Sequence, residues 1–164
     1  MCRPALLAVA LALPALGARA EELRNWFKDP FFRLTSAIPR CPEPVGPRVT
    51  EAERQAQSHR RAEKGTTCWL AKEEGCERSN AYSYDRDIAS EIQVALGGKA
   101  EFSNTTLWVT VQCRVVYVEG CVPAESMGQE IEALVRSLPH VQQAIALVTA
   151  SPESKPPYKF VSTK

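Results

Sequence analysis

Side chains suited to catalysis are scarce in this chain of 164 residues. A Ser–His–Asp site needs a histidine, and the sequence has only His59 and His140. His59 lies in a strongly charged stretch and His140 directly follows Pro139, so we predict that both lie at the surface. The motifs G-x-S-x-G and G-x-G-x-x-G and the Walker phosphate loop are absent, and no pair of carboxylates stands out in an apolar setting. We therefore expect no catalytic residue, no cofactor and no enzymatic activity.

The first twenty residues have the pattern of a cleaved export signal. Arg3 supplies a positive charge, residues 5–13 form an apolar run too short to span a bilayer, and Ala18-Arg19-Ala20 is an A-x-A cleavage pattern. We expect a soluble periplasmic chain that begins at Glu21 and has no transmembrane segment. Residues 1–20 hold two of the 20 Lys and Arg and no acid, which leaves 18 basic and 19 acidic residues. This balance gives no electrostatic case for binding nucleic acid.

Five cysteines follow residue 20, and export to an oxidising compartment predicts disulfides among them. Because five is odd, a monomer holds at most two bridges. We expect Cys68–Cys76, which closes a short loop, and Cys41–Cys121, which joins the N-terminal extension to the base of a hairpin. Cys113 is then the free thiol. The alternatives are five thiols or a metal site, but the chain has no C-x-x-C and no histidine at ligand spacing from a cysteine.

Residues 21–84 are predicted to form an N-terminal extension in three parts. The first, residues 21–48, is an irregular arm rich in aromatic residues and proline, which either packs on the domain behind it or contacts a partner or a membrane surface. A short helix follows, with a T-x-x-E capping box at Thr50 and Gly65 placed to end it. Residues 66–84 read as a loop closed by Cys68 and Cys76, with Trp69, Tyr82 and Tyr84 available to anchor it.

Residues 85–150 have the pattern of a small α+β domain. Asp85 is predicted to cap a helix with Ile88, Ile92 and Leu96 on one face. Alternating apolar residues over 107–122, broken at Gln112–Arg114, predict a tight hairpin. A second helix opened by Pro123 and a strand within 141–150 complete a two-layer αββαβ unit. The tail, residues 151–164, has three prolines and scattered charges and is predicted to be flexible.

This pattern resembles the BON domain, a small module of exported bacterial envelope and osmotic-stress proteins. The resemblance rests on the helix within 87–96, the hairpin ending in Val118-Glu119-Gly120-Cys121-Val122, and the step from Pro139 into the last strand. It covers about residues 85–150. The family commonly has glycine in the hairpin turn, where this chain has Cys113-Arg114, and glycine before Val141, where this chain has His140.

The resemblance implies an envelope module that contacts phospholipid or an envelope protein and has no catalytic residues. The expected contacts are Trp108 and Tyr117 on the hairpin and Arg114 at its turn, because Trp and Tyr suit a membrane–water interface. In a structural alternative, Trp108 and Tyr117 form a cross-strand pair that covers the open face of the sheet or meets the N-terminal arm. Two further functional alternatives are a subunit of a larger envelope assembly that docks through the arm, and a thiol-dependent redox protein that uses Cys113.

Overall fold

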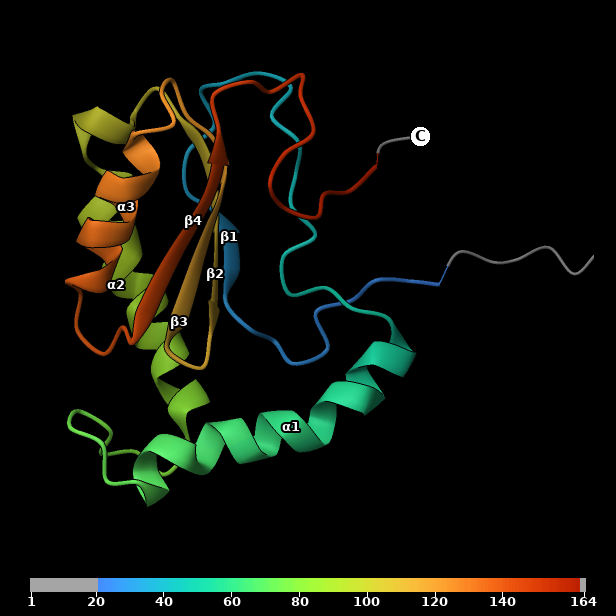
Figure 1. Ribbon diagram of the computed structural model, residues 1–164, viewed down its shortest axis with the longest axis vertical. Helices are drawn as coiled ribbons and strands as arrows, with labels where there is room; N and C mark the ends of the chain where they lie inside the picture. The colour runs from blue at the N-terminus through green and yellow to red at the C-terminus, as the bar shows by residue number, and fades with distance from the viewer. Residues whose placement is uncertain (1–20, 163–164) are drawn as a thin grey trace, which may run out of the picture.

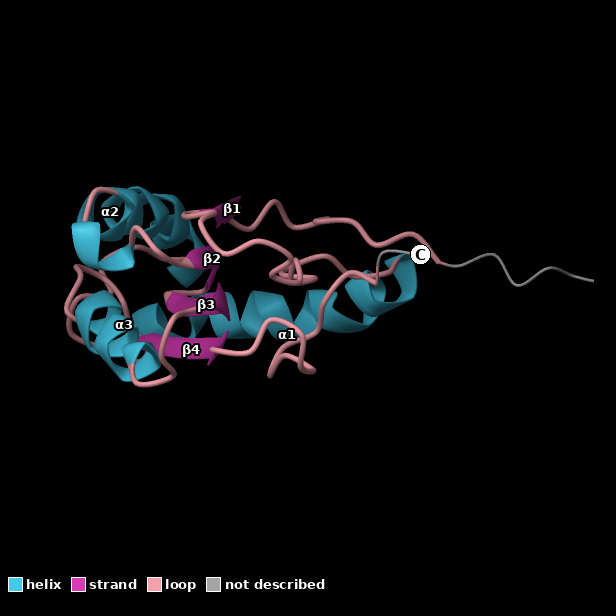
Figure 2. Ribbon diagram, turned by 90° about the horizontal axis from the view of Figure 1, so that it is seen from above, coloured by secondary structure: helices cyan, strands magenta, loops and turns pink. Residues whose placement is uncertain are grey.

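The computed structural model describes residues 21–162 and contains a four-stranded sheet with two helices on one face and a long helix that runs across the hairpin end of the sheet (Figures 1 and 2). The strands are β1 (Phe31–Arg33), β2 (Thr106–Gln112), β3 (Val115–Cys121) and β4 (Gln143–Thr149), and the helices are α1 (Glu51–Leu70), α2 (Asp85–Gly97) and α3 (Met127–Arg136). Short 3-10 helices occupy Ala81–Tyr84 and Ala100–Phe102. The expected α+β class and the αββαβ order from α2 to β4 are confirmed.

The sheet has the order β1-β2-β3-β4, antiparallel except for the parallel pair β3–β4. Helix α3 makes the crossover between these parallel strands, and α2 and α3 lie together on one face (Figure 2). Alternate residues of β2 and β3 point into this layer, so Val109 lies opposite Val118 in the buried core. Ile88 and Ile92 of α2 and Ile131 of α3 complete that core.

The arm supplies a strand that the sequence pattern does not predict. Residues 31–33 pair with the outer edge of β2, with Phe32 opposite Val109, and Phe32 and Leu34 pack against the core. Pro30 precedes the strand, which is consistent with an edge position because proline cannot donate a ladder hydrogen bond. The arm therefore packs on its own domain, the first of the two alternatives above.

Helix α1 runs past Gly65 to Leu70, so the prediction that Gly65 ends the helix is wrong. The Thr50–Glu53 capping box is present as expected. Gly65 is needed for close packing instead, because a Cβ there would lie 2.8 Å from the Asn80 side-chain oxygen. Cys68 and Trp69 consequently belong to the last turn of a helix rather than to a loop, and Trp69 is largely exposed.

Asp85 does not cap α2 with its side chain, contrary to the prediction. Its carboxylate is buried and accepts the backbone N–H groups of Cys113 (2.7 Å) and Arg114 (2.8 Å) at the hairpin turn. Both turn residues have positive φ, 56° and 65°, the conformation of a type I′ turn that favours glycine. Asp85 thus stabilises a left-handed turn that this sequence builds without glycine.

The C-terminal tail is packed through residue 161 rather than loose. We call residues 156–161 the strap. Tyr158 is buried and donates a hydrogen bond to the Pro42 carbonyl (2.8 Å), while Val45 N–H donates to Lys159 and Val161 N–H donates to Glu43. The strap and residues 41–49 together lie on the sheet face opposite α2 and α3 (Figure 1). The prediction that Pro123 opens the second helix is wrong: residues 123–126 form turns, and α3 begins at Met127.

Two disulfides tie these segments to the sheet. Cys41 bonds to Cys121 at the end of β3, Cys68 bonds to Cys76, and Cys113 is a buried free thiol. These are the pairs expected from the sequence. Disulfides of this kind indicate an oxidising compartment.

The two bridges are expected to differ in their contribution to stability, because a crosslink over a longer loop removes more entropy from the unfolded chain. Replacing Cys41 and Cys121 together by Ala opens a separation of 80 residues and is expected to lower the free energy of unfolding by about 4 kcal/mol. The same change at Cys68 and Cys76, separated by 8 residues, is the matched control, with an expected loss of about 2 kcal/mol. Urea unfolding measures both; equal losses would contradict the assignment.

Asp85→Ala leaves two buried backbone donors without an acceptor, so we expect a loss of about 3 kcal/mol in the free energy of unfolding. Asp85→Asn retains one side-chain oxygen and is expected to lose less than half as much. Guanidinium unfolding of both variants checks the order. A smaller loss for the alanine variant than for the asparagine variant would show that the carboxylate does not hold the turn.

Candidate functional site

The structure does not bring the three expected contact residues together. Trp108 and Tyr117 lie on the second face of the sheet but on different cross-strand pairs, since Trp108 is opposite Glu119 and Tyr117 is opposite Thr110. Trp108 is buried and Tyr117 is half-buried. A direct cross-strand pair between the two rings is therefore also absent.

Arg114 lies inside the hairpin end of the molecule. Its Nε donates to the His140 carbonyl (2.8 Å), its Nη1 is 3.8 Å from Cys68 Sγ, and its guanidinium lies over the Tyr84 ring at 5.2 Å. His140 is exposed as predicted, has φ of 64° where the family commonly has glycine, and contacts Tyr84 with its ring. These contacts give Arg114 a structural role at the turn and take it away from any surface next to Tyr117.

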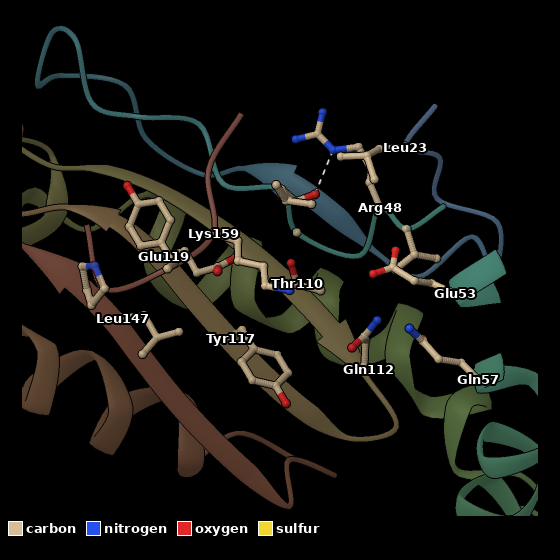
Figure 3. Close-up of a pocket in the computed structure, with 15 residues that line it drawn as sticks. Leu23, Arg48, Glu53, Gln57, Thr110, Gln112, Tyr117, Glu119, Leu147 and Lys159 are labelled. Carbon is tan, nitrogen blue, oxygen red and sulfur yellow. Dashed lines mark hydrogen bonds between the residues drawn. The ribbon is translucent and has the colours of Figure 1, made fainter. Parts of the chain in front are cut away.

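A pocket of about 520 Å³ lies on the second face of the sheet, between the sheet and the segments that cover it (Figure 3). Its floor is formed by β2, β3 and β4, and its walls come from residues 45–49, the first half of α1 and the strap. The floor residues are Thr110, Gln112, Tyr117, Glu119 and Leu147. The pocket thus combines residues from the α+β domain with residues from both terminal segments.

Two polar side chains in this floor lack partners. Thr110 Oγ1 is buried and makes no hydrogen bond with any described residue. Glu119 is 9% exposed, and neither a hydrogen bond nor a nearby charge from the described residues acts on its carboxyl. Burial raises the pKa of Glu119 to about 7. Burial also raises the pKa of Tyr158 to about 12, and the nearby Glu119 charge adds to this shift. A carboxyl in such surroundings is poised between its neutral and ionised forms at neutral pH.

The charged groups at the pocket walls are mostly engaged elsewhere. Arg48 donates to the Val45 carbonyl (2.8 Å) and to Glu43 (2.8 Å), and its guanidinium points away from Glu119 in Figure 3. Glu53 belongs to the capping box of α1. Lys159 makes no ion pair within the described part of the chain, so it is the wall cation available to a ligand.

A second polar cluster near the hairpin turn is internally satisfied. Asp29 is buried and accepts hydrogen bonds from Arg61 and Gln112, and the Arg61 guanidinium lies between the rings of Phe27 and Tyr82 at 4.1 and 4.2 Å. These contacts fix the arm and α1 to the sheet. Nothing in this cluster is left for a ligand.

Cys113 has the environment of an inert thiol. It is 3% exposed, and burial raises its pKa, whereas reactive cysteines have a depressed pKa and solvent access.

Among residues 21–162, no group of His, Cys, Asp and Glu side chains is arranged to hold a metal ion. None of the helices in this range combines the length and the apolar composition that a membrane span requires.

The sequence prediction missed Glu119 as a site residue. It appears in the sequence only as the polar member of an apolar strand, VVYVEGC. The alternation of side chains along a strand could have identified Glu119: a carboxylate two positions after Tyr117 lies on the same face of the sheet as Tyr117. Gly120, next to it, has φ of 148°, and a Cβ there would collide with the Thr106 carbonyl, which fixes this end of the strand.

The unpartnered carboxyl predicts a specific pH dependence. The unfolded chain releases the Glu119 proton near pH 4.5 and the folded chain near pH 7, so between these values the folded state binds more protons and stability falls as pH rises. Glu119→Gln is expected to stabilise the fold at pH 8 by about 2 kcal/mol, after allowing for solvent in the pocket, and to have almost no effect at pH 4. Urea unfolding at the two pH values measures this difference. Equal effects at both would mean that the carboxyl titrates normally.

Comparison with known proteins identifies the domain that forms the floor of this pocket. The family model "BON domain" matches residues 84–150, which run from the end of the first 3-10 helix through β4. Neither the curated proteins nor the solved structures give a match. The arm, α1 and the strap lie outside the matched range. The α2-β2-β3-α3-β4 order agrees with this match, and residues 84–150 of the chain are thus similar to a BON domain.

Proposed function

We propose that this protein is an exported, non-enzymatic component of the cell envelope that binds phospholipid through the surface around the sheet-face pocket. Its BON domain supports an envelope role, and its two disulfides support an oxidising location such as the periplasm. The export signal expected over residues 1–20 lies outside the described residues. The proposal extends the family expectation by naming the surface of this chain that meets the lipid.

The observation that carries this proposal is the apolar surface beside the pocket. Leu23, at one wall, is 42% exposed, and Phe160, next to the wall residue Lys159, is 41% exposed. Phe160 lines a shallow hollow that shares Val45 and Lys159 with the pocket, so these side chains belong to one continuous surface. Exposed apolar residues around a polar pocket suit a ligand with an apolar body and a polar head.

The structure favours this surface over the other functions considered. The aromatic arm pairs with β2 through β1 and packs against the core, so few of its aromatic rings remain for docking on an envelope partner. The Cys113 thiol is buried, which disfavours redox chemistry. Of the three contacts expected from the sequence, only Tyr117 lies in the proposed surface. Trp108 is buried in the sheet, and Arg114 packs at the hairpin end of the molecule.

Vesicle co-sedimentation tests the proposal. Replacing Leu23 and Phe160 together by Glu is expected to lower the affinity for phospholipid vesicles about tenfold, because each apolar side chain contributes up to about 1 kcal/mol on partial burial. Val94→Glu is the matched control: Val94 is 81% exposed on α2, on the other side of the sheet, and its replacement is expected to leave binding unchanged. Absence of vesicle binding by the unaltered protein, or an equal loss in the control, would refute the proposed surface.

A further inference from the structure

The pocket floor contains acceptors for which residues 21–162 supply no donor. Thr110 is 3% exposed with its hydroxyl oxygen unpartnered among the described residues. Glu119 is 9% exposed, and no hydrogen bond or ion pair from residues 21–162 reaches its carboxyl. The residues beside Glu119 in the sheet register are Trp108 on β2 and Leu147 on β4, neither of which neutralises a carboxylate. Leaving such groups unpaired is unfavourable, and a ligand that supplies donors removes the penalty.

The walls restrict the chemistry of that ligand. Tyr117 and Tyr158 both line the pocket, and aromatic faces beside a carboxylate favour a cation. In Figure 3, Thr110, Tyr117 and Glu119 project from the sheet into the same space, while Lys159 approaches from the strap. An acidic floor with a basic group at the wall matches a ligand that carries both charges.

We propose that the pocket receives the aminoethyl phosphate headgroup of a lipid, with its primary ammonium between Glu119 and Thr110 and its phosphate toward Lys159. This inference rests on the proposed phospholipid binding and names the headgroup. A primary ammonium has three N–H donors, enough for the Glu119 carboxylate and the Thr110 hydroxyl oxygen together. The lipid chains would then leave the pocket beside Leu23 and Phe160.

Other headgroups fit the floor less well. A quaternary trimethylammonium group has no N–H and leaves Thr110 without a donor. A headgroup with only phosphate and hydroxyl groups places negative charge toward Glu119 without a compensating cation. A free aminoethyl phosphate presents the same polar chemistry, but it has no apolar part to contact Leu23 and Phe160.

Binding of an ammonium also implies a direction for its pH dependence. The ammonium favours ionised Glu119, so affinity is expected to rise from pH 6 to pH 8 across the pKa of about 7. The charged and titratable groups facing Glu119 are Tyr117 on β3, Glu53 on α1, Arg48 in the covering loop, and Tyr158 and Lys159 on the strap. The amino group of the lipid remains protonated over this range.

The experiment compares the full mature chain on three sets of vesicles at pH 6 and 8. All contain the same fraction of phosphatidylglycerol; the remainder is phosphatidylethanolamine, phosphatidylcholine or further phosphatidylglycerol. We expect about fivefold tighter binding to the ethanolamine vesicles at pH 8 and a smaller preference at pH 6. Glu119→Gln and Thr110→Val are expected to remove this preference while retaining the residual binding to phosphatidylglycerol. Glu130→Gln, an exposed carboxylate on α3, is the control and is expected to keep it.

An additional experiment with a soluble ligand distinguishes a lipid headgroup from the free headgroup compound. Calorimetry with phosphoethanolamine is expected to show weak binding that Glu119→Gln abolishes, with the vesicle preference still present. Equal binding of ethanolamine and choline vesicles, or a preference that survives Glu119→Gln, would overturn the headgroup assignment and leave the proposed membrane surface standing. Failure of the unaltered protein to bind any vesicle overturns the proposed function instead, and soluble phosphoethanolamine binding that depends on Glu119 would then assign the pocket to the free headgroup.

Discussion

The covering of the second sheet face is the constraint on which the rest of this structure depends. One face of the sheet is buried by α2 and α3, while the other carries Trp108, Tyr117 and Leu147 and needs cover of its own. The Cys41–Cys121 disulfide holds the N-terminal segment to the end of β3. The hydrogen bond from Tyr158 to Pro42 then holds the strap to that segment. Two segments that are distant in sequence, residues 41–49 and the strap, are thereby fixed over the sheet, and the space left between them and the sheet is the pocket.

This construction explains why an unfavourable residue is tolerated in the sheet. Glu119 is buried by its covering rather than by its own strand, and the covering provides no donor for it. Functional sites commonly retain such unfavourable groups, because a group without partners inside the protein remains available to bind a ligand. A contrasting solution is present at the hairpin turn, where the buried Asp85 carboxylate accepts two backbone N–H groups and serves the fold alone.

The sequence predicts the core of the domain because local patterns specify it. Alternation in 107–122 and the spacing of Ile88, Ile92 and Leu96 correspond to β2, β3 and α2. Strand β1 is not predictable in this way, since three residues in a proline-rich arm are held in place only by pairing with β2. The strap is similarly defined by a few long-range hydrogen bonds. The pocket is formed by these tertiary contacts, which the sequence pattern does not reveal. Residue type alone therefore indicated Trp108 and Arg114, which suit an interface, and did not indicate Glu119 and Thr110.

A direct measurement of the ionisation of Glu119 tests the central claim that the covered sheet face contains an unpartnered carboxyl. The side-chain carboxyl carbon of Glu119 can be followed by NMR as a function of pH in protein labelled with carbon-13 at glutamate, with Glu119→Gln to assign the signal. We expect a midpoint near pH 7 in the free protein and a lower midpoint when the pocket holds an ammonium. A midpoint near the ordinary glutamate value in the free protein would mean that this carboxyl is solvated or paired, and would refute an unpartnered carboxyl in the pocket.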